Sequence, residues 1–196
     1  MAATEDRPNP KRSTKAMLPG AATGARRREE ILRVDHAGEL AAIKIYEGQL
    51  AILGDRAATV RSAEIIRHMA KAEARHKSSF DKLLAENRTR PTALEPLWSA
   101  AAFVLGAGSA LLGEKAAMAA TVAVEEVIDE HYSSQVAELK ERDPKLAATL
   151  EEFRAEEVEH KETGLAHGAT GAPAYPLFSG LIKAGCRLAI RIAEKV

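Results

Sequence analysis

Apolar residues recur at intervals of three and four through almost the whole chain from Glu29 onward. The first run ends near Gly54-Asp55 and includes Ile31, Val34, Ala42, Ile43, Tyr46 and Leu50. A second run extends from about Ala57 to Asn87, and Arg90-Pro91 ends it because proline cannot continue a helix. No stretch alternates as a strand would. The pattern therefore predicts an all-α protein.

The second half of the chain repeats this arrangement. An apolar segment begins near Pro96 and continues past Tyr132 to about Arg142, with a break expected among the glycines at 106–113. Asp143-Pro144 marks the start of the next helix, which should run to about His167. Residues 168–176 are expected to form a loop, and the last twenty residues another helix. We predict a four-helix bundle made of two helical hairpins, with an added hydrophobic segment and a C-terminal amphipathic helix.

Charge divides the chain into two parts. Its 28 basic and 28 acidic residues cancel, which argues against a nucleic-acid partner. Residues 1–28 nevertheless carry seven basic and two acidic residues together with several prolines and glycines, so we expect a basic disordered tail. Residues 29–196 are expected to form one domain. The single cysteine, Cys186, excludes a disulfide framework and a cysteine-rich metal site.

The candidate chemistry lies in two Glu-x-x-His motifs and two further glutamates. Glu73 precedes His76 by three residues, and Glu157 precedes His160 by three, so each pair shares one face of a helix. Two such matches are weak evidence in a chain rich in glutamate. The case is strengthened by Glu39 and Glu125, each of which lies on an apolar stripe. A buried carboxylate without a partner is costly, so these positions indicate a bound cation or another compensating partner.

Spacing supports a shared site. Glu39 and Glu73 are separated by 34 residues, and Glu125 and Glu157 by 32, with the helix breakers near both midpoints. Antiparallel hairpins would therefore bring all four carboxylates to nearly the same level. Four carboxylates and two imidazoles suit iron or manganese better than zinc. One such residue alone would be interpreted as solvated surface charge, but six in matching positions favour the metal site.

Several other residues are candidates for supporting roles. Tyr46 and Tyr132 each follow a lone glutamate by seven residues, which suggests a duplicated hairpin. His131 and Tyr132 are candidate catalytic residues close to the metal, although an exposed role for His131 is equally compatible with the sequence. Asp35 could accept a hydrogen bond from a ligand imidazole or lie on the helix surface.

Two segments suggest contact with a membrane. Eighteen uncharged residues run from Pro96 to Gly113, which is the lower limit for a membrane span. In the last helix, basic residues recur every fourth position, at Lys183, Arg187, Arg191 and Lys195. A basic amphipathic helix suits an anionic membrane surface, whereas the alternative is a docked helix with a solvated basic face. We expect peripheral association rather than a span.

A set of motifs in a fixed order makes the chain resemble a known family. The motifs are Arg33-Val-Asp-His-Ala-Gly-Glu39, Arg90-Pro-Thr, Leu97-Trp98, Leu105-Gly-Ala-Gly, Thr121-Val-Ala-Val-Glu-Glu126, His131-Tyr132, Glu156-Glu-Val-Glu-His160 and Ala184-Gly-Cys-Arg187. Together they resemble the demethoxyubiquinone monooxygenases, which hydroxylate demethoxyubiquinol in ubiquinone biosynthesis. The resemblance covers about residues 30–196.

This resemblance implies a ferritin-like di-iron protein that hydroxylates the ring of a polyprenyl methoxy-benzoquinol with O2. It implies two iron ions per subunit, with NADH as an electron source, and a lipid-presenting accessory protein is a further candidate partner. The ligands it implies are the six residues reached above: Glu39, Glu73, His76, Glu125, Glu157 and His160. The short N-terminal arm favours the cytoplasmic face of a bacterial inner membrane over the matrix side of the mitochondrial inner membrane.

Two other functions share some of these features. A ferritin-like ferroxidase or iron-storage protein would use the same six ligands but would not need the uncharged segment or the basic terminal helix. A metal-free, membrane-associated helical bundle would leave the six residues as surface charge. Measuring bound iron distinguishes the hydroxylase from the metal-free bundle. The reaction catalysed distinguishes it from the ferroxidase or iron-storage protein.

Overall fold

The structure of the chain, a computed structural model, describes residues 21–54 and 57–195. These residues form six α-helices: α1 (Ala21–Leu53), α2 (Val60–Asn87), α3 (Glu95–Leu111), α4 (Glu114–Leu139), α5 (Pro144–Ala166) and α6 (Tyr175–Ala193). Two short 3-10 turns, η1 (Ala57–Thr59) and η2 (Ala169–Gly171), join them. No strand occurs within the described ranges, so the prediction of an all-α helical bundle is confirmed.

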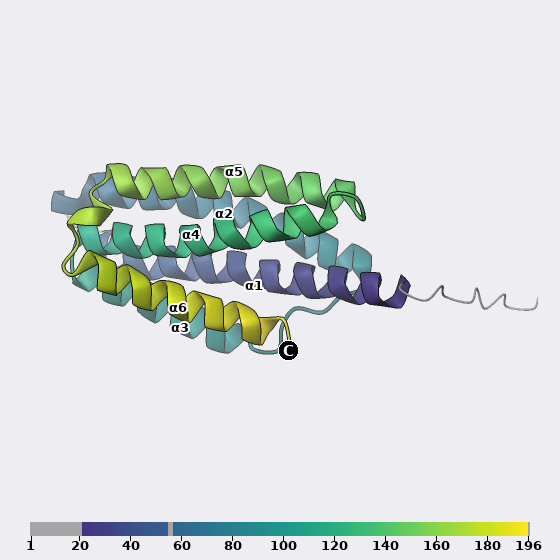
Figure 1. The fold of residues 1–196 in the computed structure, drawn as a ribbon. Helices are drawn as coiled ribbons and strands as arrows, with labels where there is room; N and C mark the ends of the chain where they lie inside the picture. The colour runs from purple at the N-terminus through teal and green to yellow at the C-terminus, as the bar shows by residue number, and fades with distance from the viewer. Residues whose placement is uncertain (1–20, 55–56, 196) are drawn as a thin grey trace, which may run out of the picture.

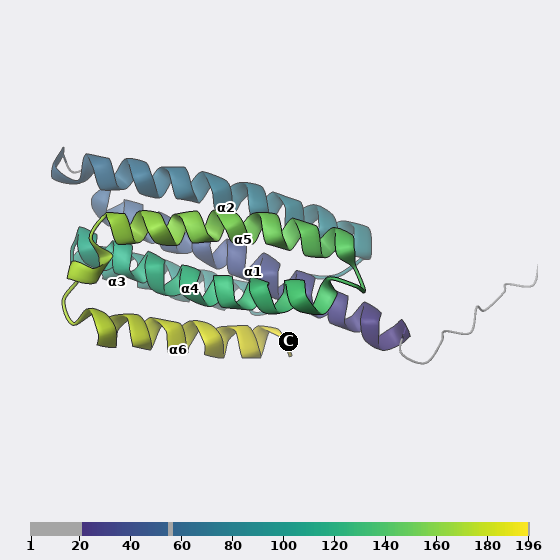
Figure 2. The same ribbon diagram turned by 45° about the horizontal axis from the view of Figure 1, so that its top comes forward.

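The helices lie in three layers of two (Figures 1 and 2). The first layer contains α2 and α5, the middle layer α1 and α4, and the third layer α3 and α6. The main packing contacts are those of α1 with α2 and α3, and those of α4 with α5 and α6. The predicted hairpins are therefore α1–α2 and α4–α5, and α3 and α6 cover the other side of the middle layer.

The first helix begins earlier than predicted. Its start at Ala21 precedes the expected start at Glu29, so residues 21–28 do not belong to the expected tail. Alanine and arginine, which dominate this stretch, are strong helix formers. Two ties also hold it to the bundle: Arg27 donates to Glu138 at 3.1 Å, and Arg28 donates to Asn87 at 3.0 Å. Residues 1–20 of the expected tail lie outside the described residues.

The other helix boundaries agree closely with the sequence pattern. The break expected among residues 106–113 lies at the end of this range, between α3 and α4. Gly113 adopts a φ of 112° there, which a residue with a side chain rarely tolerates. The α5 helix begins at Pro144, and the Asp143 side chain accepts a hydrogen bond from the Leu146 amide at 3.2 Å. This cap satisfies one of the free amides at the helix start.

Glycines allow the third layer to approach the middle layer closely. A Cβ atom on Gly106 of α3 would collide with the backbone of Ile45, and one on Gly48 of α1 would collide with the backbone of Phe103. Only glycine fits at both points, so the two helices cross backbone to backbone. This crossing holds α3 against the side of α1 that faces away from α2.

Candidate metal centre

All six predicted ligands meet in the centre of the four-helix bundle. Each comes from the helix that the sequence pattern assigned to it: Glu39 from α1, Glu73 and His76 from α2, Glu125 from α4, and Glu157 and His160 from α5. Every one of these residues is buried, with at most 5% of its surface exposed. The carboxylates thus lie at one level, as the spacing of the hairpins predicted.

The six residues form two overlapping groups of four. One group contains Glu39, Glu73, His76 and Glu157, and the other contains Glu73, Glu125, Glu157 and His160. Within each group the candidate ligand atoms all lie within 4.8 Å of one another. Glu73 and Glu157 belong to both groups, so the arrangement fits two neighbouring metal ions that share two carboxylates.

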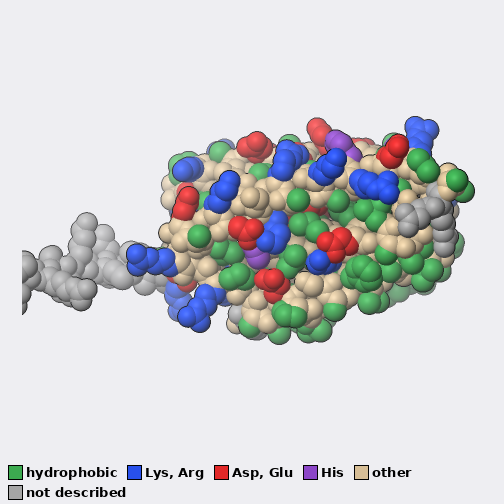
Figure 3. Space-filling view, turned by 180° about the vertical axis from the view of Figure 1, so that it is seen from behind, with side chains coloured by type: hydrophobic (Ala, Val, Ile, Leu, Met, Phe, Trp, Pro, Cys, Tyr) green, Lys and Arg blue, Asp and Glu red, His purple; other side chains and the backbone are tan. Residues whose placement is uncertain are grey.

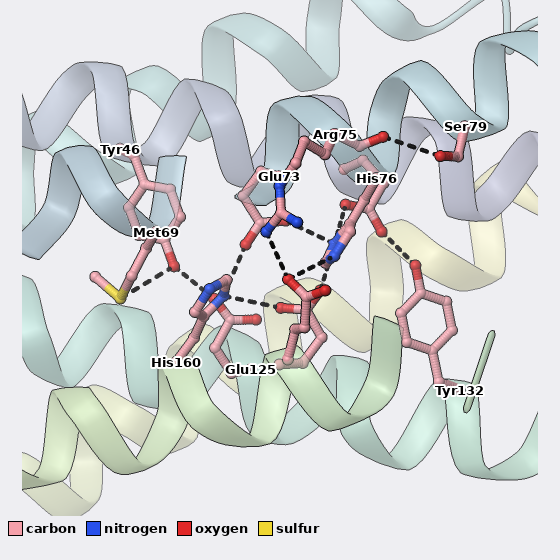
Figure 4. A network of polar contacts seen from close by, with 12 residues as sticks. Tyr46, Met69, Glu73, Arg75, His76, Ser79, Glu125, Tyr132 and His160 are labelled. Carbon is pink, nitrogen blue, oxygen red and sulfur yellow. Dashed lines mark hydrogen bonds and ion pairs between the residues drawn. The ribbon is translucent and has the colours of Figure 1, made fainter. Parts of the chain in front are cut away.

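Both histidines direct the same ring nitrogen toward the carboxylates (Figure 4). The Nδ1 atom of His76 lies 3.1 Å from Glu157 Oε1 and 3.3 Å from Glu39 Oε2. The Nδ1 atom of His160 lies 3.0 Å from Glu73 Oε1 and 3.2 Å from Glu157 Oε2. Each imidazole is therefore oriented to bind one metal ion through Nδ1.

Two tyrosines hold the unshared carboxylates from opposite ends of the cluster (Figure 4). The Tyr46 hydroxyl donates to Glu125 Oε1 at 2.8 Å, and the Tyr132 hydroxyl donates to Glu39 Oε1. Each tyrosine thus supports the glutamate of the other hairpin. Because both phenols are buried, these hydrogen bonds restrict the orientation of the two carboxylates.

Burial and mutual contact perturb the ionisation of the cluster. Burial raises the pKa of Glu39 and of Glu125 well above the ordinary value. Burial would also raise the pKa of Glu73, but the close imidazoles of His160 and His76 outweigh it and hold this pKa at about 2. Although burial lowers the histidine pKa values, the close carboxylates of Glu157 and its neighbours raise the pKa of His76 to about 12 and that of His160 to about 10. Without metal, protons on the imidazoles compensate the carboxylates.

The donor set fits a metal ion better than it fits protons alone. Four buried ligand atoms that face the cluster make no hydrogen bond of regular geometry: Glu39 Oε2, Glu73 Oε1, Glu157 Oε1 and His76 Nδ1. His76 Nε2, on the outer side of its ring, makes none either. Buried polar atoms without partners are costly, and all four point into the cluster. Metal ions bound there would satisfy these atoms.

The remaining polar residues near the site form two further contacts. Asp35 does not contact a ligand imidazole; instead its Oδ1 accepts a hydrogen bond from Gln135 at 2.8 Å and lies 3.3 Å from His131 Nε2. His131 and Tyr132 both border the small cavity beside the ligands. Sequence reasoning placed Glu156 in a family motif but gave it no role at the site, and its Oε2 lies 3.3 Å from His76 Nε2.

An apolar cavity adjoins the ligands. It has a volume of about 510 Å³, lies between α1, α3, α4 and α6, and is lined almost wholly by alanine, glycine and aliphatic side chains with Trp98, Phe178 and Cys186. Five lining residues also border the small cavity at the carboxylates: Val34, Gly38, Ala42, Ile128 and Ile190. The two cavities therefore adjoin, and these apolar side chains lie between the third layer and the ligand cluster.

Large exposed apolar side chains lie on α3, directly after its last residue, and on α6. They are Leu97, Phe103, Val104, Leu111, Leu112, Leu177, Leu181 and Leu188, and hydrophobic side chains follow the lower edge of the molecule in Figure 3. An apolar surface of this kind marks a site of association. Within the described residues, no helix is long and apolar enough to cross a membrane.

The predicted basic stripe of α6 is partly used inside the molecule. Lys183 forms an ion pair with Glu126 of α4, and Arg187 contacts Glu130 of α4 at 2.8 Å. Half of the stripe therefore helps to hold α6 against the bundle. The docked-helix alternative accounts for these two residues; within the described part of the chain, Arg191 and Lys195 form no such ion pair.

The fold and the cluster define a class of proteins, the ferritin-like di-iron carboxylate proteins. The particular family follows from sequence comparison. A family model described as ubiquinone biosynthesis protein COQ7 matches residues 26–193. The chain belongs to this family.

Several similar proteins carry the names of hydroxylases. The chain is 53% identical over 179 residues to the 3-demethoxyubiquinol 3-hydroxylase of Rhodospirillum rubrum, covering 91% of this chain and 83% of the relative. It is 46% identical over 172 residues to the human NADPH-dependent 3-demethoxyubiquinone 3-hydroxylase, mitochondrial, with 86% and 77% covered. It is 37% identical over 183 residues to the yeast 5-demethoxyubiquinone hydroxylase, mitochondrial, with 86% and 78% covered.

Proposed function

We propose that this chain hydroxylates the ring of demethoxyubiquinol with O2, using two iron ions held by the six buried ligands. One observation carries the proposal: two groups of metal ligands that share Glu73 and Glu157 lie directly beside an apolar cavity. The names of the relatives identify the substrate class that fits this pairing of a polar centre with an apolar pocket.

The six ligands would divide between the two ions. Glu39 and His76 would hold one ion and Glu125 and His160 the other, and Glu73 and Glu157, which belong to both groups, would help to hold both. Four carboxylates balance the charge of two divalent cations. Iron held there would supply the redox chemistry that reduces O2 and transfers one of its oxygen atoms to the ring.

The protein would place the ring and exclude water. The cavity volume of about 510 Å³ lies within the range of small-molecule sites. Its apolar lining suits an isoprenoid chain, and Val34, Ile128 and Ile190, which border both cavities, would hold the ring next to the carboxylates. Tyr46 and Tyr132 would keep the unshared carboxylates in position through their hydrogen bonds.

The electron donor is proposed to be a reduced nicotinamide. The family resemblance led us to expect NADH, whereas the names of the human and mouse relatives specify NADPH. Measuring turnover with each nucleotide decides between them.

We further propose that the chain associates peripherally with a membrane through the exposed apolar side chains of α3 and α6. A polyprenyl chain is apolar and would partition into a membrane, and the cavity lies between these same helices. A lipid-presenting protein could occupy the same surface. The eukaryotic relatives are named mitochondrial, and for this chain we retain the cytoplasmic face of a bacterial inner membrane as the proposed location.

An iron-storage or ferroxidase function shares the ligands but leaves the apolar cavity without a role. A metal-free bundle leaves four buried carboxylates without compensation other than protons, which is costly. Both alternatives therefore explain less of the structure than the hydroxylase does.

The direct test is anaerobic reconstitution with Fe²⁺ followed by addition of O2, a reductant and demethoxyubiquinol. The hydroxylated quinol should form only with iron and oxygen, and one product oxygen atom should derive from O2 when ¹⁸O2 is supplied. If reconstituted protein consumes O2 and deposits ferric iron without forming hydroxylated product, the ferroxidase alternative is correct.

A further inference from the structure

The two halves of the ligand cluster differ on the outer side of their histidines. His76 and His160 both turn Nδ1 toward the carboxylates. On the far side of the ring, His76 Nε2 lies 3.3 Å from Glu156 Oε2, a contact that crosses from α2 to α5. Among the described residues, no carboxylate contact is found for His160 Nε2. The two histidines therefore differ in the surroundings of Nε2.

Glu156 is itself held in place. Arg75, the residue before His76, donates to the same oxygen of Glu156 at 2.9 Å. Two consecutive residues of α2 thus converge on one carboxylate of α5, as the dashed lines from Arg75 and His76 show in Figure 4. About 28% of the Glu156 side chain is exposed, so the carboxylate can remain charged without a metal of its own.

The contact between His76 Nε2 and Glu156 matters because metal binding fixes the tautomer of an imidazole. When a metal ion binds Nδ1 of a neutral imidazole, the ring proton must be on Nε2. His76 Nε2 lies 3.3 Å from Glu156 Oε2 without a hydrogen bond of regular geometry, so a small rotation of the ring would bring that proton onto the Glu156 carboxylate. Such a hydrogen bond fixes the orientation of the ring and makes Nδ1 a stronger ligand. His160 lacks this support within the described structure.

We propose that Glu156 is a positioning residue for one of the two metal ions: it holds His76 from behind and makes the site of Glu39 and His76 the tighter of the two. This inference rests on the proposed two-metal function. It predicts sequential loading, with the His76 site filled first and the His160 site second.

The test is an anaerobic titration of the full chain with Co²⁺, whose absorption spectrum reports binding in place of Fe²⁺. The wild type should bind two ions in separable steps. Glu156→Ala should weaken one step by about 10- to 100-fold and leave the other unchanged, because loss of such a partner has effects of this size on metal affinity. Glu156→Gln should weaken it less, because the amide oxygen can still accept a hydrogen bond.

Glu159→Ala is the matched control. Glu159 is an exposed glutamate on the same helix, so its removal takes away the same charge close to the cluster. A general electrostatic effect would weaken both steps alike in both variants. That outcome, or wild-type binding by Glu156→Ala, would overturn the proposal.

A second control uses His76→Ala. Since Glu156 is proposed to act only through His76, the combined variant should bind metal as His76→Ala does. A further loss in the combined variant would contradict this route. If the wild type binds no metal at all, the two-metal function fails; if the wild type binds two ions and Glu156→Ala does the same, only the present inference fails.

Discussion

The two faces of the middle layer differ in chemistry. Toward α2 and α5, the helices α1 and α4 present Glu39 and Glu125 to the ligand cluster. Toward α3 and α6, the same helices present small apolar residues such as Gly38, Ala42 and Val124 to the cavity. Because Glu39 and Gly38 are neighbours in the chain, the proposed metal ligands and the proposed substrate pocket adjoin without any intervening loop. One pair of helices therefore supplies both functions.

The largest effect should come from a ligand shared by both metal groups. Glu157→Ala removes a carboxylate from each group, so both ions and all hydroxylation should be lost, whereas Glu39→Ala affects only one group directly. Metal content and product formation should be measured on the same preparations. Glu152→Ala, an exposed change on the same helix, is the control. Full metal content in Glu157→Ala would contradict the assignment of Glu157 as a shared ligand.

A change on the apolar face should separate substrate binding from metal binding. Gly38 borders both cavities, and a Cβ atom there would meet only Ile128 Cδ1, at 4.0 Å. Gly38→Leu should therefore fold but fill the junction. Displacement of the ring by about 1 Å can cost about 100-fold in rate, so kcat/KM should fall by about that factor with both metal ions retained.

The control for this variant is Ala51→Leu, which adds the same side chain to an exposed position of α1. Its kcat/KM should equal that of the wild type. If Gly38→Leu hydroxylates the substrate at the wild-type rate, the apolar cavity is not the route by which the ring reaches the cluster.

The ligand cluster should also bind metal more tightly at higher pH. Without metal, the close carboxylates raise the pKa of His160 to about 10 and that of His76 to about 12, so both imidazoles are protonated near neutrality. A metal ion must displace these protons. Apparent affinity should rise by about tenfold per pH unit for each displaced proton. An affinity that is constant or falls between pH 6 and 8 would contradict protonated imidazoles in the metal-free cluster.

A smaller effect is expected at the exposed end of the apolar face. Leu111 and Leu112 are both more than 60% exposed, and burial of one leucine in a membrane contributes about 1.5–3 kcal/mol. Replacing both by serine should weaken flotation with anionic vesicles without affecting metal content. Lys183→Gln should have little effect on flotation, because Lys183 pairs with Glu126. The opposite ranking would assign membrane binding to the basic stripe instead.

The sequence predicts most of the ligand cluster because helix periodicity places residues on faces. The two hairpins, the level of the four carboxylates and the break before α4 all follow from spacing and helix breakers. Contacts across helices do not follow in this way. The seven-residue spacing identifies Tyr46, but only the packing of α1 against α4 shows that it supports Glu125.

Two further features depend on distances between helices. Glu156 is one of many glutamates on α5, and nothing in its spacing distinguishes a carboxylate that reaches His76 from one that faces water. The early start of α1 depends on Arg27 and Arg28, whose partners are distant in the chain. Local composition predicted a tail for residues 21–28 because composition does not reveal contacts with residues as distant as Glu138 and Asn87.

The number of iron ions bound per chain after anaerobic reconstitution tests the central claim most directly. The account predicts two ions for the wild type, with a Mössbauer spectrum that shows two coupled sites after exposure to O2. One ion per chain, or two ions retained when Glu73 and Glu157 are both replaced by alanine, would contradict a centre built on two shared carboxylates.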